Sequence, residues 1–134
     1  MDKSQINAKI REKEKAIDNY EADIRQLKRK LDDLDDLLRR LASYRNDFTQ
    51  AQATRMSMLR AVSNWAVNTR ITNPYSMDMG DRINGQKHRN ALGELDTAKR
   101  LLNNKNDAIE EEIERLKRKI RNYEKDITDL KKLL

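Results

Sequence analysis

The sequence is poor in the residue types that usually build a compact catalytic site. It has no cysteine, one histidine, one proline and three glycines, and aromatic residues make up only 4%. The absence of cysteine excludes disulfide bonds, thiolate catalysis and cysteine-ligated metal sites. No apolar run approaches the ~18 residues needed to cross a bilayer. The first residues, MDKSQINAKI, lack the apolar stretch of a signal peptide. We therefore expect a cytoplasmic protein that would leave the cell only by a non-classical route.

Charged residues are abundant instead, at 39% of the 134 residues. This composition fits either a disordered chain or long amphipathic helices, and periodicity decides for helices. In the N-terminal part apolar residues recur at alternating steps of four and three, interrupted only at Lys13 and Arg45. Such a heptad row predicts a helix that packs on another helix. The row comprises Ile6, Ile10, Ile17, Tyr20, Ile24, Leu27, Leu31, Leu34, Leu38, Leu41 and Phe48.

A second heptad row occupies the C-terminal part, interrupted by Asn106. It comprises Leu102, Ile109, Ile113, Leu116, Ile120, Tyr123, Ile127, Leu130 and Leu134. The two rows predict an all-α fold, a long antiparallel helical hairpin (a coiled coil) forming a single domain over residues 1–134. We expect a helix over about 4–71 with Ser4 as its N-cap, a turn over about 72–80 and a helix over about 81–134. The pattern does not distinguish a continuous first helix from one bent between Ser43 and Ala53. Because each stripe is narrow, we expect the hairpin to complete a helical bundle with a partner.

The middle of the chain differs from its flanks. Residues 71–85 hold the only proline, Pro74, and two of the three glycines, which predicts the chain reversal. Residues 49–90 contain six basic and two acidic residues, so they carry four of the six net positive charges. Asp81 and Asn84 are candidate N-caps for the second helix.

Methionine and other apolar residues concentrate in this middle part, and not all of them fit on one seam. Met58 and Leu59 are adjacent, so they face different directions on a helix. Ordinary packing explains these residues as well as a partner surface does, and the two interpretations are compatible; methionine adapts to either, and tryptophan is a favoured interface anchor. The candidate partner-binding residues are Met56, Met58, Leu59, Val62, Trp65, Tyr75, Met77, Met79, Ile83 and Gly85.

The sequence gives little support to catalysis, cofactors, metals or nucleic acid. His88 stands in a polar run, QKHRN, and is expected at the surface. The carboxylates of Asp32 to Asp36 and Glu110 to Glu114 lie off the heptad rows beside basic residues, which favours a solvated face with local ion pairs over a metal site. Nucleic-acid binding is disfavoured because the chain lacks the uninterrupted basic block that precedes a zipper. We expect a non-enzymatic protein.

Two stretches carry a family resemblance: the start of the second helix, DRINGQKHRNAL, and the tail IEEEIERLKRKIRNYEKDITDLKK. With the helical layout, they resemble a bacterial family of small helical proteins, the YwqH-like proteins associated with LXG toxins. More distantly the layout is similar to the WXG-like hairpins of type VII secretion. Two departures stand out. Ile83 takes a place where the family often has tryptophan, and Tyr123-Glu124-Lys125-Asp126 is one residue short of a Tyr-x-x-x-Asp/Glu export signal.

The resemblance implies a chaperone-like targeting factor that binds the N-terminal helical domain of an LXG toxin for type VII secretion. A second small helical protein would then supply the export signal, and the chain itself would stay in the cytoplasm or be co-secreted. The competing interpretation is a homo-oligomeric coiled-coil scaffold, which predicts self-association and no dedicated partner. A prefoldin-like chaperone is disfavoured because residues 49–90 lack the alternation of β-hairpins.

Overall fold

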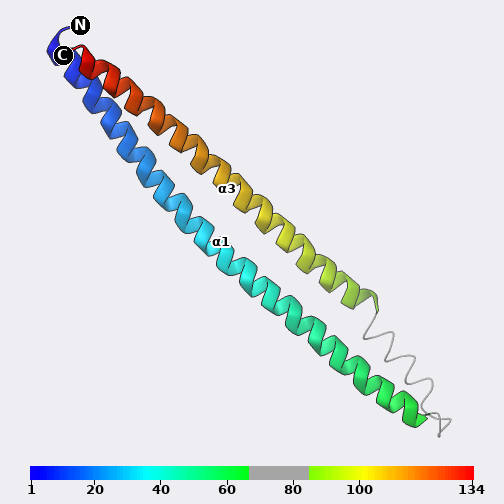
Figure 1. Cartoon of the computed structure of the whole chain (residues 1–134). Helices are drawn as coiled ribbons and strands as arrows, with labels where there is room; N and C mark the ends of the chain where they lie inside the picture. Colours follow the sequence, from blue (N-terminus) through cyan, green and yellow to red (C-terminus); the bar gives the residue numbers. More distant parts are fainter. Residues whose placement is uncertain (67–84) are drawn as a thin grey trace. The chain divides into compact units, whose positions relative to one another are not determined.

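The computed structural model describes residues 1–66 and 85–134, and for residues 62–66 the backbone alone. These residues form two helices, α1 (Lys3–Ala66) and α3 (Gln86–Lys132) (Figure 1). No strand occurs in the described ranges, so the all-α prediction is confirmed. α1 is helical throughout Ser43–Ala53. The predicted turn over 72–80 lies outside the described residues, as do the expected helix ends near Ile71 and Asp81 and the candidate cap Asn84.

α1 begins at Lys3, two residues earlier than a Ser4 cap predicts, because Asp2 and not Ser4 is its N-cap. The Gln5 backbone N–H donates to Asp2 Oδ1 at 2.8 Å, and the Asp2 N–H donates to Gln5 Oε1 at 3.2 Å. The Ile6 N–H then donates to the Asp2 carbonyl at 3.1 Å. This reciprocal capping box satisfies donors that the first turn would otherwise leave unpaired. The Ser4 prediction is wrong because the residue two places before it caps better.

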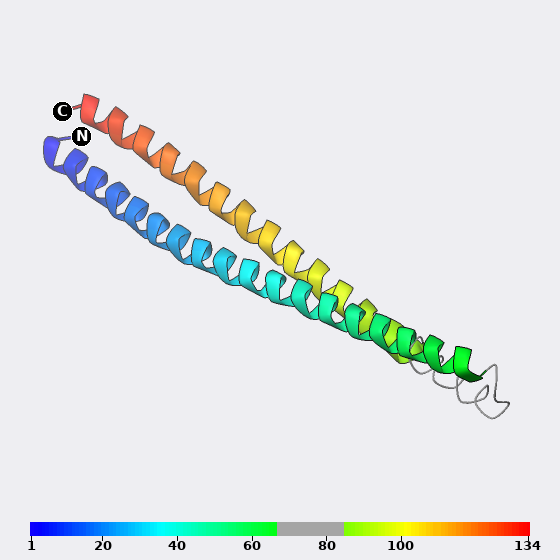
Figure 2. The same cartoon turned by 60° about the horizontal axis from the view of Figure 1, so that its bottom comes forward.

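The chain divides into two structural units, each built from both helices. The terminal unit comprises Met1–Asp35 and Asn103–Leu134, and the central unit comprises Asp36–Leu102. In the terminal unit the beginning of α1 contacts the end of α3, and in the central unit the later half of α1 contacts the beginning of α3, so the helices run antiparallel (Figures 1 and 2). Both chain ends belong to the terminal unit. The helix–helix contacts are those of a helical hairpin.

The terminal unit holds almost the whole buried core. One cluster joins Ile6, Ile10 and Ile17 of α1 to Ile127 of α3. A second joins Ile24 to three residues of α3, namely Ile109, Ile113 and Leu116. All are 9% exposed or less, and all belong to the predicted heptad rows. Burial of this isoleucine-rich seam supplies the hydrophobic free energy that holds α1 against α3.

Lys13, the first polar interruption of the α1 row, contacts α3 across this seam. Its ammonium lies 3.2 Å from Asp126 Oδ2 and 4.7 Å from the centre of the Tyr123 ring. Tyr123 in turn packs on Tyr20, with ring centroids 5.8 Å apart. The pKa of Tyr123 is raised. The main cause is the hydrogen bond with Tyr20, and the second is the electrostatic effect of Tyr20. A charged residue at one seam position favours a single register over neighbouring ones.

The predicted solvated face is confirmed by local ion pairs. Asp36 pairs with Arg40 at 2.9 Å, and Glu114 pairs with Lys117 at 3.5 Å. Glu112 pairs with Arg115, and that hydrogen bond lowers the pKa of Glu112. Among the residues that the structure describes, no group of carboxylates or histidine is arranged to hold a metal ion. Neither described helix is long and apolar enough to cross a membrane.

Candidate partner-binding surface

The seam of the central unit is more polar and less closed than that of the terminal unit. Leu59 is its only buried apolar residue among the described side chains, at 9% exposure. Leu38, Leu41, Phe48 and Leu95 are half-buried. The central unit therefore has less hydrophobic free energy holding its own helices together, and more of its apolar surface stays exposed.

His88 lies in this seam, so its predicted surface position is wrong. Its ring stacks on Phe48 with centroids 4.7 Å apart and planes inclined by 12°. Its Nε2 atom is buried and has no hydrogen-bond partner in the part of the chain that the structure describes. The sequence gives little sign of this packing, because His88 is flanked by polar residues. Its position nevertheless continues the heptad row of α3 towards the N-terminal end of the helix. A buried polar atom without a partner costs stability.

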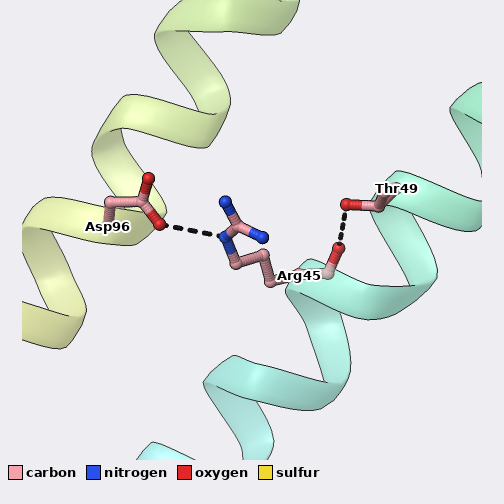
Figure 3. Close-up of polar contacts among 3 residues, drawn as sticks. All are labelled: Arg45, Thr49 and Asp96. Atoms are coloured by element: carbon pink, nitrogen blue, oxygen red, sulfur yellow. Dashed lines mark hydrogen bonds and ion pairs between the residues drawn. The ribbon is translucent and has the colours of Figure 1, made fainter.

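Arg45, the second polar interruption of the α1 row, also pairs with α3. Its Nε donates to Asp96 Oδ1 at 2.9 Å (Figure 3). The Thr49 hydroxyl donates to the Arg45 carbonyl oxygen at 2.8 Å, one turn along the same helix. The Arg45 and Asp96 side chains are 45% and 57% exposed, so the pair contributes little stability. The pair shows which side of α1 and which side of α3 face each other in the central unit. We call the side that carries Arg45 and Asp96 the ion-pair side.

α1 carries a second apolar row outside the seam, which we call the outer row. It consists of Leu37, Tyr44, Ala51 and Met58, each seven residues after the last. All four are exposed; Leu37 is 45%, Tyr44 64% and Met58 66% accessible. In ordinary coiled coils the positions flanking the seam carry charged residues. Here the positions on one flank are apolar and exposed.

The outer row lies on the side opposite to the ion-pair side. Each residue turns a helix by about 100°, so the seam residue Leu41 has Arg45 on one flank and Tyr44 on the other. On α3, Leu95 likewise separates Asp96 from Leu101. Because Arg45 contacts Asp96, Tyr44 and Leu101 share the opposite side of the central unit. Leu101 is 59% exposed.

A shallow depression on the outer surface of α3 is lined by Arg89, Asn90, Gly93, Glu94, Thr97, Ala98 and Leu101. A Cβ atom built on Gly93 would meet nothing within 4 Å. The outer row of α1 together with Leu101 of α3 forms what we call the docking face.

The predicted partner-binding residues fall in three groups. Of the methionines on α1, Met58 is exposed in the outer row and Met56 is half-buried, while the adjacent Leu59 is buried, so Met58 and Leu59 do face different directions. Gly85 is half-buried, and its carbonyl accepts the Arg89 N–H at 3.2 Å at the start of α3. The others lie outside the described side chains: Val62, Trp65, Tyr75, Met77, Met79 and Ile83.

Leu37, Tyr44 and Leu101 were not among the predicted partner-binding residues. Their signal in the sequence is the seven-residue spacing from Leu37 to Met58, which is weaker than the seam row beside it. In the sequence this spacing continues to Trp65. Comparison of the chain with protein-family models, with curated proteins and with solved structures found no match.

Proposed function

We propose that this chain is a non-enzymatic helical adaptor that binds another helical protein through its central unit. The observation that carries the proposal is the outer row, an exposed apolar stripe at heptad spacing on a helix whose own seam is already occupied. Burying such a stripe against a partner helix gives hydrophobic stabilisation without any catalytic group. The Arg45–Asp96 ion pair is compatible with this function, because it joins α1 to α3 within the central unit that carries the stripe.

The partner that we propose is the helical N-terminal domain of an LXG-type toxin, with the chain acting as a targeting factor for type VII secretion. The similarity of DRINGQKHRNAL and of the C-terminal tail to YwqH-like proteins supports this choice. Tyr123 and Asp126 both contact α1, which fits a role in holding the helices together and leaves the export signal to a second small helical protein.

A tagged pull-down from the native host, with bound proteins identified by mass spectrometry, tests the adaptor function. The expected result is a large protein with a helical N-terminal domain and a toxin-like C-terminal domain, with or without a second small helical protein. Recovery of the same chain alone at stoichiometric amounts would replace the adaptor by a homo-oligomeric scaffold.

A further inference from the structure

We infer that the ion-pair side of the central unit is a second binding surface, which takes an acidic segment of a partner protein with an apolar side chain beside its carboxylates. The inference goes beyond the proposed adaptor function, because this side lies opposite to the docking face and one helix cannot cover both. It rests on a basic surface that surrounds a depression between α1 and α3.

The depression lies beside the ion pair of Arg45 and Asp96. Only the Nε atom of Arg45 is joined to Asp96, so the Nη groups of its guanidinium remain for another acceptor (Figure 3). Lys99 makes no ion pair with any residue that the structure describes. A carboxylate complements such an arginine and lysine, and an adjacent apolar side chain complements the leucines between them. The lining residues are Leu41, Ala42, Arg45, Asn46, Thr49, Leu95 and Lys99.

The excess positive charge of the central unit lies around this depression. Residues seven apart share one side of a coiled-coil helix, so the rows through Asn46 on α1 and Asp96 on α3 mark the ion-pair side. The basic residues in these two rows, in the lining or one turn after Asp96 are all exposed: Arg39, Arg45, Arg60, Arg89, Lys99 and Arg100. The one acidic residue of this side, within the described chain, is Asp96.

The rest of the described central unit is electrically balanced. It has three basic and three acidic residues, namely Arg40, Arg55, Lys87, Asp36, Asp47 and Glu94. The ion-pair side is therefore where an acidic molecule is attracted to the central unit, and complementary charge speeds association and fixes orientation.

The apolar lining favours a protein segment over other polyanions. A phosphate backbone brings no apolar group to fill the depression. Single-stranded nucleic acid stacks its bases on aromatic rings, and the exposed ring of the described central unit, Tyr44, lies on the opposite side. A helix that lies on a membrane carries its cations beside its apolar face. Here the cations and the outer row are on opposite sides, so one lipid surface does not contact both.

Binding of labelled polyanions to the full chain tests the inference. The first probe is a fluorescein-labelled glutamate-rich peptide of about 16 residues, about 24 Å long as a helix, with two leucines at its centre. The second replaces these leucines by serine, and the third is a DNA duplex of about 16 base pairs. We expect the leucine peptide to bind at least ~10-fold more tightly than the serine peptide, and to weaken as salt is added. Fluorescence anisotropy measures all three affinities.

Paired variants locate the surface. Lys99→Glu is expected to weaken binding of the leucine peptide at least ~10-fold, and Lys99→Gln at least ~3-fold, since both remove an unpaired ammonium from the depression. Lys87→Glu makes the same charge reversal on the same helix and is the control. Lys87 stands two heptads before Leu101, away from the ion-pair side, so this variant should change the affinity less than ~3-fold. Circular dichroism verifies that all three remain helical.

Four results would overturn the inference. Equal binding of the two peptides would remove the role of the depression, and equal losses in Lys99→Glu and Lys87→Glu would reduce the effect to net charge. A duplex that binds as tightly as the leucine peptide would assign the basic surface to nucleic acid. Failure of the leucine peptide to bind would exclude an acidic segment, and a self-complex in light scattering that Lys99→Glu dissociates would then assign the surface to a second copy. The first three results leave the adaptor function untouched, since the pull-down tests it separately.

Discussion

His88 and Tyr123 are single residues whose polar groups lie against aromatic rings between the helices, with different consequences. His88 stacks on Phe48 and leaves Nε2 buried without a described partner. Tyr123 packs on Tyr20 and lies under the Lys13 ammonium. The unsatisfied Nε2 of His88 opposes folding. At Tyr123 the hydrogen bond with Tyr20 raises the pKa and favours the neutral phenol, against the opposing charge of Lys13. Each makes a prediction for one substitution.

Replacing His88 by phenylalanine is expected to stabilise the chain by about 1 kcal/mol, because the ring stacking on Phe48 is kept and the buried nitrogen is removed. The measurement is urea unfolding followed by circular dichroism at 222 nm. His88→Gln, which keeps a polar side chain, is the control and should bring no gain. A loss of stability in His88→Phe would mean that Nε2 has a partner outside the described residues.

Raising the pH above about 10 is expected to destabilise the chain through Tyr123. Its folded-state pKa is raised, so the folded state holds this proton more tightly than the unfolded state does. The stabilisation is complete below the ordinary tyrosine pKa and is lost as the pH rises through the raised folded value.

Tyr123→Phe should flatten this alkaline loss in urea midpoints measured between pH 8 and 11. The exposed Tyr44→Phe is the control and should retain the slope of the unmodified chain. Identical slopes in Tyr123→Phe and the unmodified chain would show that Tyr123 does not carry the alkaline dependence.

At the scale of the elements, α1 carries two rows of apolar residues that differ in burial. Its seam row packs against α3, and Ile24 is 8% exposed there. Its outer row leaves Leu37 45% exposed. The rows are distinguished by burial and not by hydrophobicity, so matched truncations of one residue in each separate folding from binding.

Ile24→Ala is expected to lower the free energy of unfolding by about 2 kcal/mol, because it opens a cavity in a closed cluster. Leu37→Ala should change it by less than about 0.5 kcal/mol, as surface substitutions usually do. Urea unfolding measures both. In the pull-down we expect the opposite ranking. Leu37→Ala should recover less partner than Ile24→Ala, because the folded fraction of Ile24→Ala keeps its outer row. Equal losses of stability in the two variants would place Leu37 in the seam.

At the scale of the whole molecule, stability is unevenly divided between the two units. The terminal unit holds eight of the nine buried apolar residues of the described chain, and the central unit holds the other, Leu59. Segments with few buried apolar contacts open at a lower free energy than the rest of a protein.

Hydrogen exchange is expected to be slower in the terminal unit than in the described part of the central unit. Amides near Ile17 and Ile113 should be protected longest, and those near Tyr44 and Leu95 should exchange earlier. Exchange measured by mass spectrometry on the isolated chain tests this order. Adding the bound partner should slow exchange around Tyr44 selectively; uniform protection of both units in the isolated chain would contradict the uneven division.

The all-α class and the seam of the terminal unit follow from the sequence alone. Isoleucines such as Ile10, Ile17 and Ile113 recur at a period that places them on one face of a helix, and no other regular structure buries them together. The ion-pair partners were not predictable in the same way. Lys13 and Arg45 read as interruptions of a pattern, and only the pairing of α1 with α3 brings Asp126 and Asp96 to them.

Tertiary structure likewise decided that His88 packs between the helices and that the outer row stays exposed. Local polarity placed His88 at the surface, but packing set it against Phe48, because a heptad position near a helix start is buried whenever a partner helix reaches it. Tyr44 and Leu101 are far apart in sequence, and they share one side only because Arg45 and Asp96 fix how the helices face each other. The sequence by itself determined the periodicity that makes each helix amphipathic. Which apolar residues remained exposed was decided by the pairing, since one helix can cover only one face of another.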